Sequence, residues 1–145
     1  NKIALGHHYD DVIETTLMNL LNSGSFQTML PKLKSTNFEG MELIRPMYLI
    51  REKDIISWKN YHHLQFIQCA CRFTENCAVC DNGGGGLQRY ATKQLIKELV
   101  KNYNPQVEKN IFKSADNVTL DMILGYKQKG VHHSYLDTYD DKKED

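Results

Sequence analysis

The stretch KIALGHHYDDVIETTLMNLL (residues 2–21) constrains the fold more than any other part of the chain. Residues 2–5 form a short apolar run of the kind found in buried strands, and a glycine ends it. Residues 11–22 follow with a helical apolar period, whose stripe consists of Ile13, Leu17, Leu20 and Leu21. A strand that passes directly into an amphipathic helix is the repeating unit of α/β folds with a mostly parallel sheet.

Both ends of this helix carry sequence signals. Asp11, followed three positions later by Glu14, has the spacing of a capping box. The sequence Asn22-Ser23-Gly24 is typical of a helix C-terminus, because glycine tolerates the left-handed conformation that ends many helices. We therefore expect the helix to begin near residue 11 and to end near residue 22.

The following residues continue the alternation of strands and helices. Two extended segments are expected within residues 29–48, with a turn at the glycine at position 40 and an irregular point at the proline at position 46. Residues 51–63 return to a helical period, and their apolar side chains Ile55, Ile56 and Trp58 are expected to be buried. Residues 64–69 (LQFIQC) then suggest another strand.

The second half of the chain has a different character. Residues 69–86 contain four cysteines and four consecutive glycines without apolar periodicity, which predicts a loop or a metal-organised segment. We interpret Gly83–Gly86 as a hinge, because no strand precedes it and no Gly-Lys-Ser/Thr follows it. Helices are expected at 87–103 and about 105–114, and a turn with one short apolar anchor at 116–126. The acidic tail is expected to fray, and His132-His133 is placed in a polar loop without a role.

Composition limits the classes of function. The 145 residues suit one domain or a piece of a larger one, and the formal net charge is zero, so any nucleic-acid surface must be local. No apolar stretch reaches membrane-spanning length and no signal peptide is evident, so we expect no membrane partner and a cytoplasmic location. Because the first strand starts directly at Asn1, we also expect a natural N-terminal part to be missing.

The turn between the first strand and the first helix is the candidate ligand site. Ligands of open α/β sheets gather at the carboxyl ends of strands, beside the following helix starts. There Gly6 would let the backbone approach a ligand, and His7 and His8 could donate hydrogen bonds or bind a transition metal. Asp10 and Asp11 supply the oxygen ligands that Mg²⁺ prefers, although an aspartate at a helix start is also an ordinary cap.

Several motifs in a fixed order resemble one family. The stretch LGHHYDDVIETTLMNLLNSG, then MLPKL, then LIRPMYLIREKDI are similar to the later half of PP-loop ATP pyrophosphatases that modify tRNA. The similarity runs from Asn1 to about Tyr126, and is greatest to the tRNA 2-thiocytidine synthetase group; lysidine synthetase is a more distant relative. The resemblance implies part of an adenine nucleotide alpha hydrolase-like α/β domain over residues 1–70, and a cysteine-rich loop with C-terminal helices and tail over residues 71–145.

The resemblance also implies a reaction. Such an enzyme adenylates a tRNA base oxygen with ATP and releases pyrophosphate, after which sulfur displaces AMP. His7 and Asp11 would then lie beside the nucleotide and its Mg²⁺, Asp10 would be a second carboxylate or the cap, and Arg45 would complement phosphate charge or form a structural ion pair. The family's S-G-G-x-D-S phosphate loop is absent from this sequence, so we expect this chain alone to be inactive.

The cysteines form two close pairs, Cys69-x-Cys71 and Cys77-x-x-Cys80. In an intracellular chain such a density indicates Zn²⁺ or an iron–sulfur cluster more than disulfides, although small buried thiols would explain it too. The family resemblance favours a 4Fe–4S cluster on three cysteines, two of them in an upstream C-x-x-C. The third would be Cys69, with Cys77 or Cys80 as the alternatives. A sulfur donor of the cysteine desulfurase type is then implied, and a homodimer is left open.

The helix at 87–103 carries a basic stripe, formed by Arg89, Lys93, Lys97 and Lys101. Such a stripe is either a solvated helix face or a surface for tRNA phosphates, whose binding would depend on salt and not on sequence. Three hypotheses therefore stay open: a tRNA-thiolating enzyme, a lysidine-type ligase with structural zinc, and a non-catalytic zinc-knuckle module. The third leaves the GHHYDD and IRPM motifs unexplained.

Overall fold

The computed structural model describes residues 1–66 and 84–139, and the chain divides into two compact units. Unit 1 is Asn1–Ala115 and contains a small sheet and the long helices, whereas unit 2 is Asp116–Asp145 and contains a hairpin. The division at residue 70 expected from the sequence stays a prediction. In the described part of the chain, no helix combines the length and the apolar character that crossing a membrane requires.

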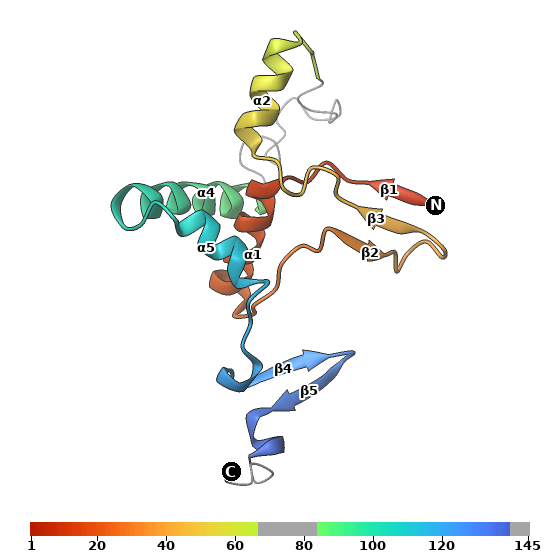
Figure 1. The fold of residues 1–145 in the computed structure, drawn as a ribbon, viewed down its shortest axis with the longest axis vertical. Coiled ribbons are helices and arrows are strands. Elements are labelled where there is room, and N and C mark those ends of the chain that lie inside the picture. The colour runs from red at the N-terminus through yellow and green to blue at the C-terminus, as the bar shows by residue number, and fades with distance from the viewer. Residues whose placement is uncertain (67–83, 140–145) are drawn as a thin grey trace. The chain divides into compact units, whose positions relative to one another are not determined.

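The sheet of unit 1 has three short strands in the order β1-β3-β2 (Figure 1). Strand β1 (Lys2–Ala4) is parallel to β3 (Glu42–Ile44), and β2 (Lys32–Lys34) is antiparallel to it. The expected strand at 2–5 and the extended segments within 29–48 are confirmed, and β3 ends before Pro46. The described sheet is mixed, and the expected burial of β1 was wrong, since only Ile3 is even half-buried.

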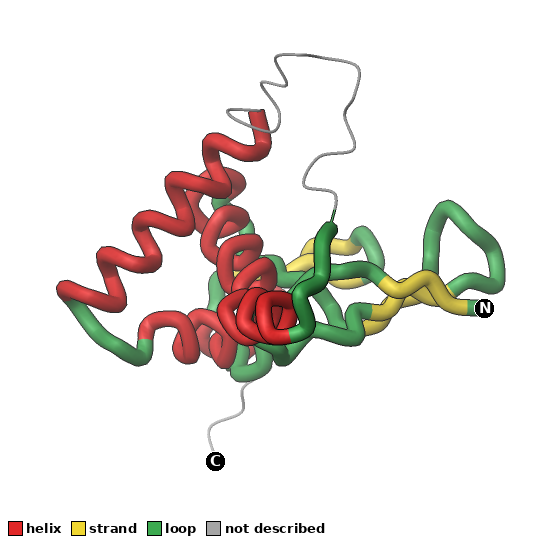
Figure 2. Tube along the Cα trace, turned by 90° about the horizontal axis from the view of Figure 1, so that it is seen from above, coloured by secondary structure: helices red, strands yellow, loops and turns green. Residues whose placement is uncertain are grey.

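Three helices pack together at one end of unit 1, with the strands at the other end (Figures 1 and 2). They are α1 (Tyr9–Ser23), α4 (Gly84–Asn102) and α5 (Val107–Ser114). The core between them comprises Ile13, Leu17 and Ile96, against which pack Tyr9, Leu95, Val100, Ile111 and Phe112. Full burial of each such apolar side chain contributes about 1.5–3 kcal/mol. This cluster therefore fixes where the start of α1 lies relative to α4 and α5.

Helix α1 begins two residues earlier than the sequence indicated. His8 is the N-cap, and the Asp11 carboxylate accepts the His8 backbone N–H at 2.9 Å, so the expected pairing of Asp11 with Glu14 was wrong. Gly24 ends the helix in the left-handed conformation (φ 57°), as expected. The apolar stripe is shorter than expected, because Leu20 and Leu21 are about half exposed.

Helix α2 (Glu52–Tyr61) exists as expected but has no buried residue. Ile56 is 49% exposed and Trp58 is 56% exposed, so the predicted burial was wrong. The reason is visible in Figure 1, where α2 projects away from the three packed helices. Residues 64–66 of the expected strand at 64–69 are not extended in a sheet, and the remainder lies outside the described residues.

Helix α4 begins at Gly84, three residues earlier than expected. The interpretation of the glycine run as a hinge is therefore wrong for residues 84–86, which are helical, while Gly83 lies outside the described residues. The helix end at Asn102 and the short helix α5 agree with the expectations.

Unit 2 contains a β-hairpin that the sequence did not reveal. Strand β4 (Gly125–Gln128) pairs antiparallel with β5 (Val131–Ser134), between the short 3-10 helices η1 (Leu120–Met122) and η2 (Tyr135–Thr138). The turn residues Lys129 and Gly130 both have positive φ, which is the pattern of a two-residue hairpin turn. His132 and His133 consequently lie on a strand and not in a loop.

Candidate functional site

The turn between β1 and α1 is held against the segment that follows β3. The Leu5 N–H donates to the Ile44 carbonyl at 2.8 Å, and the Tyr9 N–H donates to the Ile50 carbonyl at 3.0 Å. The GHHYDD motif and the residues after the IRPM motif, more than 30 residues apart in the sequence, are thereby brought together, as the order of the motifs indicated. At Gly6 a Cβ would only touch Met47 Cε at 3.9 Å, so neighbouring atoms do not demand a glycine there.

Arg45 fixes the orientation of His7. Its Nε–H donates to His7 Nδ1 at 3.2 Å, and its Nη1 donates to the Leu30 carbonyl. A neutral imidazole that accepts at Nδ1 carries its proton on Nε2. His7 is therefore set up as a hydrogen-bond donor through Nε2, and Arg45 acts within this site as a brace between the motif and the strands.

Asp10 is the centre of a network that reaches three elements. Its Oδ1 lies 2.8 Å from Arg51 Nη2, and its Oδ2 accepts the Glu52 backbone N–H at 2.7 Å. Arg51 in turn donates twice to the Glu108 carboxylate of α5, with both distances 2.8 Å. The pKa of Arg51 is raised, chiefly by the hydrogen bonds to Glu108, and its guanidinium lies 5.1 Å from the centre of the Tyr9 ring.

Asp11 connects the motif to α4. Arg89 Nη1 donates to Asp11 Oδ1 at 2.7 Å and to Glu14 Oε2 at 3.2 Å, across sequence separations of 78 and 75 residues. One helical turn further on, Lys93 pairs with Glu52. Glu14 is 5% exposed, and its pKa is raised because burial disfavours the ionised form more than the nearby cations favour it. The charged groups at the start of α1 are thus largely paired with one another.

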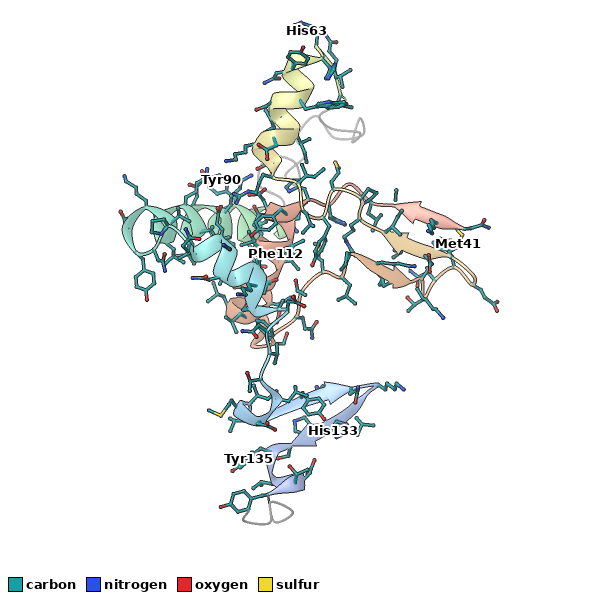
Figure 3. All side chains as sticks on the ribbon, in the orientation of Figure 1. Met41, His63, Tyr90, Phe112, His133 and Tyr135 are labelled. Carbon is teal, nitrogen blue, oxygen red and sulfur yellow. The ribbon has the colours of Figure 1, made fainter. Side chains whose placement is uncertain are left out.

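Two adjoining cavities lie at this network. One of about 250 Å³ is lined by His8, Asp11, Arg89 and Tyr90, among others, and one of about 150 Å³ by Asp10, Arg51, Lys97 and Glu108, among others. Figure 3 shows Tyr90 on α4 and Phe112 on α5, whose ring stacks on Tyr9 at 4.4 Å. Pockets for small ligands have volumes of about 300–1,000 Å³. The described residues therefore form one side of a nucleotide site and do not enclose a nucleotide.

The carboxylates of the motif do not fit a Mg²⁺ ion held by both Asp10 and Asp11. Each already pairs with a guanidinium and accepts a backbone N–H. A cation held there would have to displace Arg51 and Arg89, and the described residues contain no group of three or more His, Cys, Asp or Glu that could hold a metal ion. A metal that bridges a bound nucleotide would need ligands from elsewhere.

The basic stripe predicted on α4 is divided between two environments. Arg89 and Lys93 face the acidic residues of unit 1, and the exposed Lys97 and Lys101 follow further along the helix. Contact with tRNA phosphates stays a prediction for all four. Cys69, Cys71, Cys77 and Cys80 lie outside the described residues, so their ligand roles also stay predictions.

Sequence reasoning missed the roles of three groups, Glu14, Arg51 and Glu108. The first two lie inside the motifs that carry the family resemblance, Glu14 in GHHYDDVIET and Arg51 in LIRPMYLIREKDI. Their positions were therefore available as a signal. Glu108 lies in a short helix outside those motifs, and only the packing of α5 against α1 reveals its contact with Arg51.

Comparison with known proteins supports the arrangement of these motifs. Residues 1–72 match the model of the PP-loop domain family. The tRNA-cytidine(32) 2-sulfurtransferase of Geobacter sulfurreducens is 36% identical over 118 residues, which are 81% of this chain and 42% of the relative. The proteins of the same name from Geotalea uraniireducens and Coxiella burnetii are 38% and 35% identical, over 89% and 88% of this chain and 47% and 45% of theirs.

The chain thus spans less than half the length of these curated relatives. The matched domain contains β1, the GHHYDD turn, α1 and the arginines after β3, which are the parts from which the candidate site is built. We conclude that the chain belongs to the PP-loop family.

Proposed function

We propose that this chain is part of an ATP-dependent enzyme that replaces the oxygen of a tRNA cytidine by sulfur. The observation that supports it best is the similarity to tRNA-cytidine(32) 2-sulfurtransferases over more than four fifths of the chain, motifs included. In this reaction the base oxygen attacks the α-phosphate of ATP and pyrophosphate leaves. A sulfide then attacks the activated carbon, and AMP carries the oxygen away.

The residues of the GHHYDD turn have defined tasks in this proposal. His7, oriented by Arg45, donates a hydrogen bond through Nε2 to a phosphate or to the base oxygen. Asp10 and Asp11 keep Arg51 and Arg89 at the site, so that two guanidinium groups balance the charge of a bound nucleotide. ATP use follows the PP-loop family, and no step depends on Mg²⁺, which stays a prediction.

The finer parts of the proposal concern groups outside the described residues. A 4Fe–4S cluster would be held in part by Cys69, with Cys77 or Cys80 as alternatives, and would carry the sulfur before its transfer. The anchoring of Arg89 on Asp11 supports this, because the chain returns from the cysteine segment directly to the motif. The sulfur donor would be of the cysteine desulfurase type, the location cytoplasmic, and the assembly a homodimer.

A chimaera tests the metal part of the proposal. The 118 matched residues of the Geobacter sulfurreducens relative are exchanged for the corresponding residues of this chain, and the product is purified without oxygen. Iron, zinc and acid-labile sulfide are then measured, with a Cys69→Ala variant beside it. Near-stoichiometric iron and sulfide support sulfur transfer. Zinc without sulfide would contradict it, and would favour a lysidine-type ligase or a zinc-knuckle module.

A further inference from the structure

The largest cavity among the described residues lies in unit 2, far in sequence from the PP-loop motifs. Its volume is about 430 Å³, and it is lined by the hairpin and the two 3-10 helices that flank it. Tyrosines 126, 135 and 139 line it together with His133 and the carboxylates Asp121 and Asp137. Figure 3 shows His133 on β5 and Tyr135 just after it. Nothing in the proposed reaction uses this cavity.

The aromatic side chains of the cavity offer flat surfaces to a ligand. Tyr126 and His133 stack across the hairpin, with ring centres 4.8 Å apart and planes 17° apart. Tyr126 is 38% exposed, Tyr135 50% and Tyr139 66%, although buried tyrosines are common and exposed ones need a reason only when they gather around a cavity. Proteins use exposed aromatic rings of this kind to stack unpaired bases of RNA.

The polar groups complement a base and its phosphates. Asp121 and Asp137 can only accept hydrogen bonds when ionised, and a carboxylate is the acceptor that suits the amino group of cytosine. Asp137 already accepts the Ser134 N–H at 2.8 Å, which fixes its position at the cavity. The hairpin from Gly125 to Ser134 carries Lys127 and Lys129 and no acidic residue, so its turn is suited to phosphate oxygens.

We propose that unit 2 binds an unpaired, amino-bearing base of single-stranded RNA, with the ring between tyrosines and its amino group on Asp121. The proposal takes its RNA from the proposed function, since the substrate there is a tRNA. It predicts that oligocytidine binds more tightly than oligouridine, because uracil has no amino group to donate. A ligand made only of phosphates, or a paired duplex, would not fill the cavity.

The test uses the complete chain and 5′-labelled RNA 10-mers of cytidine and of uridine, with fluorescence anisotropy as the readout. Tyr126→Ala is expected to weaken oligocytidine binding about ten-fold, and Tyr126→Phe to retain it. Tyr103→Ala, which removes a tyrosine that is 81% exposed in unit 1, is the matched control and should change nothing. Equal losses from Tyr103→Ala and Tyr126→Ala would overturn the proposal.

A second variant guards against unfolding of the hairpin. Asp121 lies on the exposed helix η1, and Asp121→Asn is expected to reduce the preference for cytidine over uridine without lowering uridine binding. Equal binding of both RNAs by the unaltered chain, or no RNA binding at all, would overturn the proposal. Because the readout is binding and not thiolation, RNA binding without thiolated product would contradict only the proposed function. Thiolation with unaltered binding by these variants would contradict only this inference.

Discussion

At the level of single residues, the aspartates of the GHHYDD motif act as anchors for arginines. Asp10 holds Arg51, and Asp11 shares Arg89 with Glu14. From the sequence these aspartates were expected to be magnesium ligands, because neighbouring carboxylates at the end of a strand suit that ion. The pairing changes the expectation for what their replacement does.

The Asp11–Arg89 pair is predicted to couple α1 to α4. Asp11→Asn and Arg89→Gln should each lower the free energy of unfolding, and the double variant should lose less than the sum of the two. Because the Arg89 side chain is 38% exposed, solvent weakens the pair, and the expected coupling is about 0.5–1 kcal/mol. Urea denaturation of the four proteins measures it. Strictly additive losses would show that the pair contributes nothing.

Glu14 is predicted to make stability depend on pH. Burial raises its pKa, so the folded chain holds a proton on Glu14 at pH values where the unfolded chain has released it. The free energy of unfolding should therefore fall as the pH rises from about 4.5. Glu14→Gln removes this loss, so its stability relative to the unaltered chain should grow between pH 4 and pH 7.

The measurement is urea denaturation at pH 4, 5.5 and 7, with Glu98→Gln on the exposed side of α4 as the matched control. An advantage of Glu14→Gln at pH 7 is expected, by about 1 kcal/mol. If the variant instead became less stable than the unaltered chain as the pH rises, the pair with Arg89 would outweigh the burial of Glu14.

At the level of elements, helix α1 combines a buried first half with an exposed end. Ile13 is 1% exposed and packs in the core, whereas Leu20 on the same helix is 51% exposed. Ile13→Ala should lower the free energy of unfolding by about 2–5 kcal/mol, and Leu20→Ala, the matched control, by less than about 0.5 kcal/mol. Thermal unfolding followed by circular dichroism compares them. Similar losses at both positions would mean that α1 is buried along its whole length.

The sequence predicted the existence of the helices better than their surroundings. The apolar period located α1, α2, α4 and α5, and the glycine at position 24 marked the end of α1, because these signals are local. Whether Trp58 or Leu20 is buried depends on which elements pack nearby, and periodicity carries no such information. The hairpin escaped notice because its turn is Lys129-Gly130 and not the more telling Asn-Gly.

The candidate site was predicted in the same uneven way. The approach of the GHHYDD turn to the segment after β3 followed from the order of the motifs. The partners Arg89 and Glu108 did not, since they lie 78 and 98 positions from Asp11 and Asp10 and meet them only through the packing of α4 and α5. Arg89 looked like part of a solvated basic stripe because every fourth residue of its helix is a cation.

At the level of the whole molecule, the described residues account for one side of a nucleotide site. The cavities at the motif are smaller than a nucleotide requires, and the chain spans less than half of its curated relatives. The helices of unit 1 keep the GHHYDD turn, the segment after β3 and the start of α4 together. This arrangement supports a nucleotide site that lies close to where the chain returns from its cysteines.

The most direct measurement is the content of 2-thiocytidine in tRNA. The chimaera with the Geobacter sulfurreducens relative is expressed in a bacterial strain that lacks this nucleoside, and the digested tRNA is analysed by mass spectrometry for 2-thiocytidine and for lysidine. We predict that 2-thiocytidine is restored by the chimaera and lost with His7→Ala, which removes the oriented donor. A folded chimaera that yields no 2-thiocytidine, or that forms lysidine instead, would contradict the assignment to tRNA thiolation.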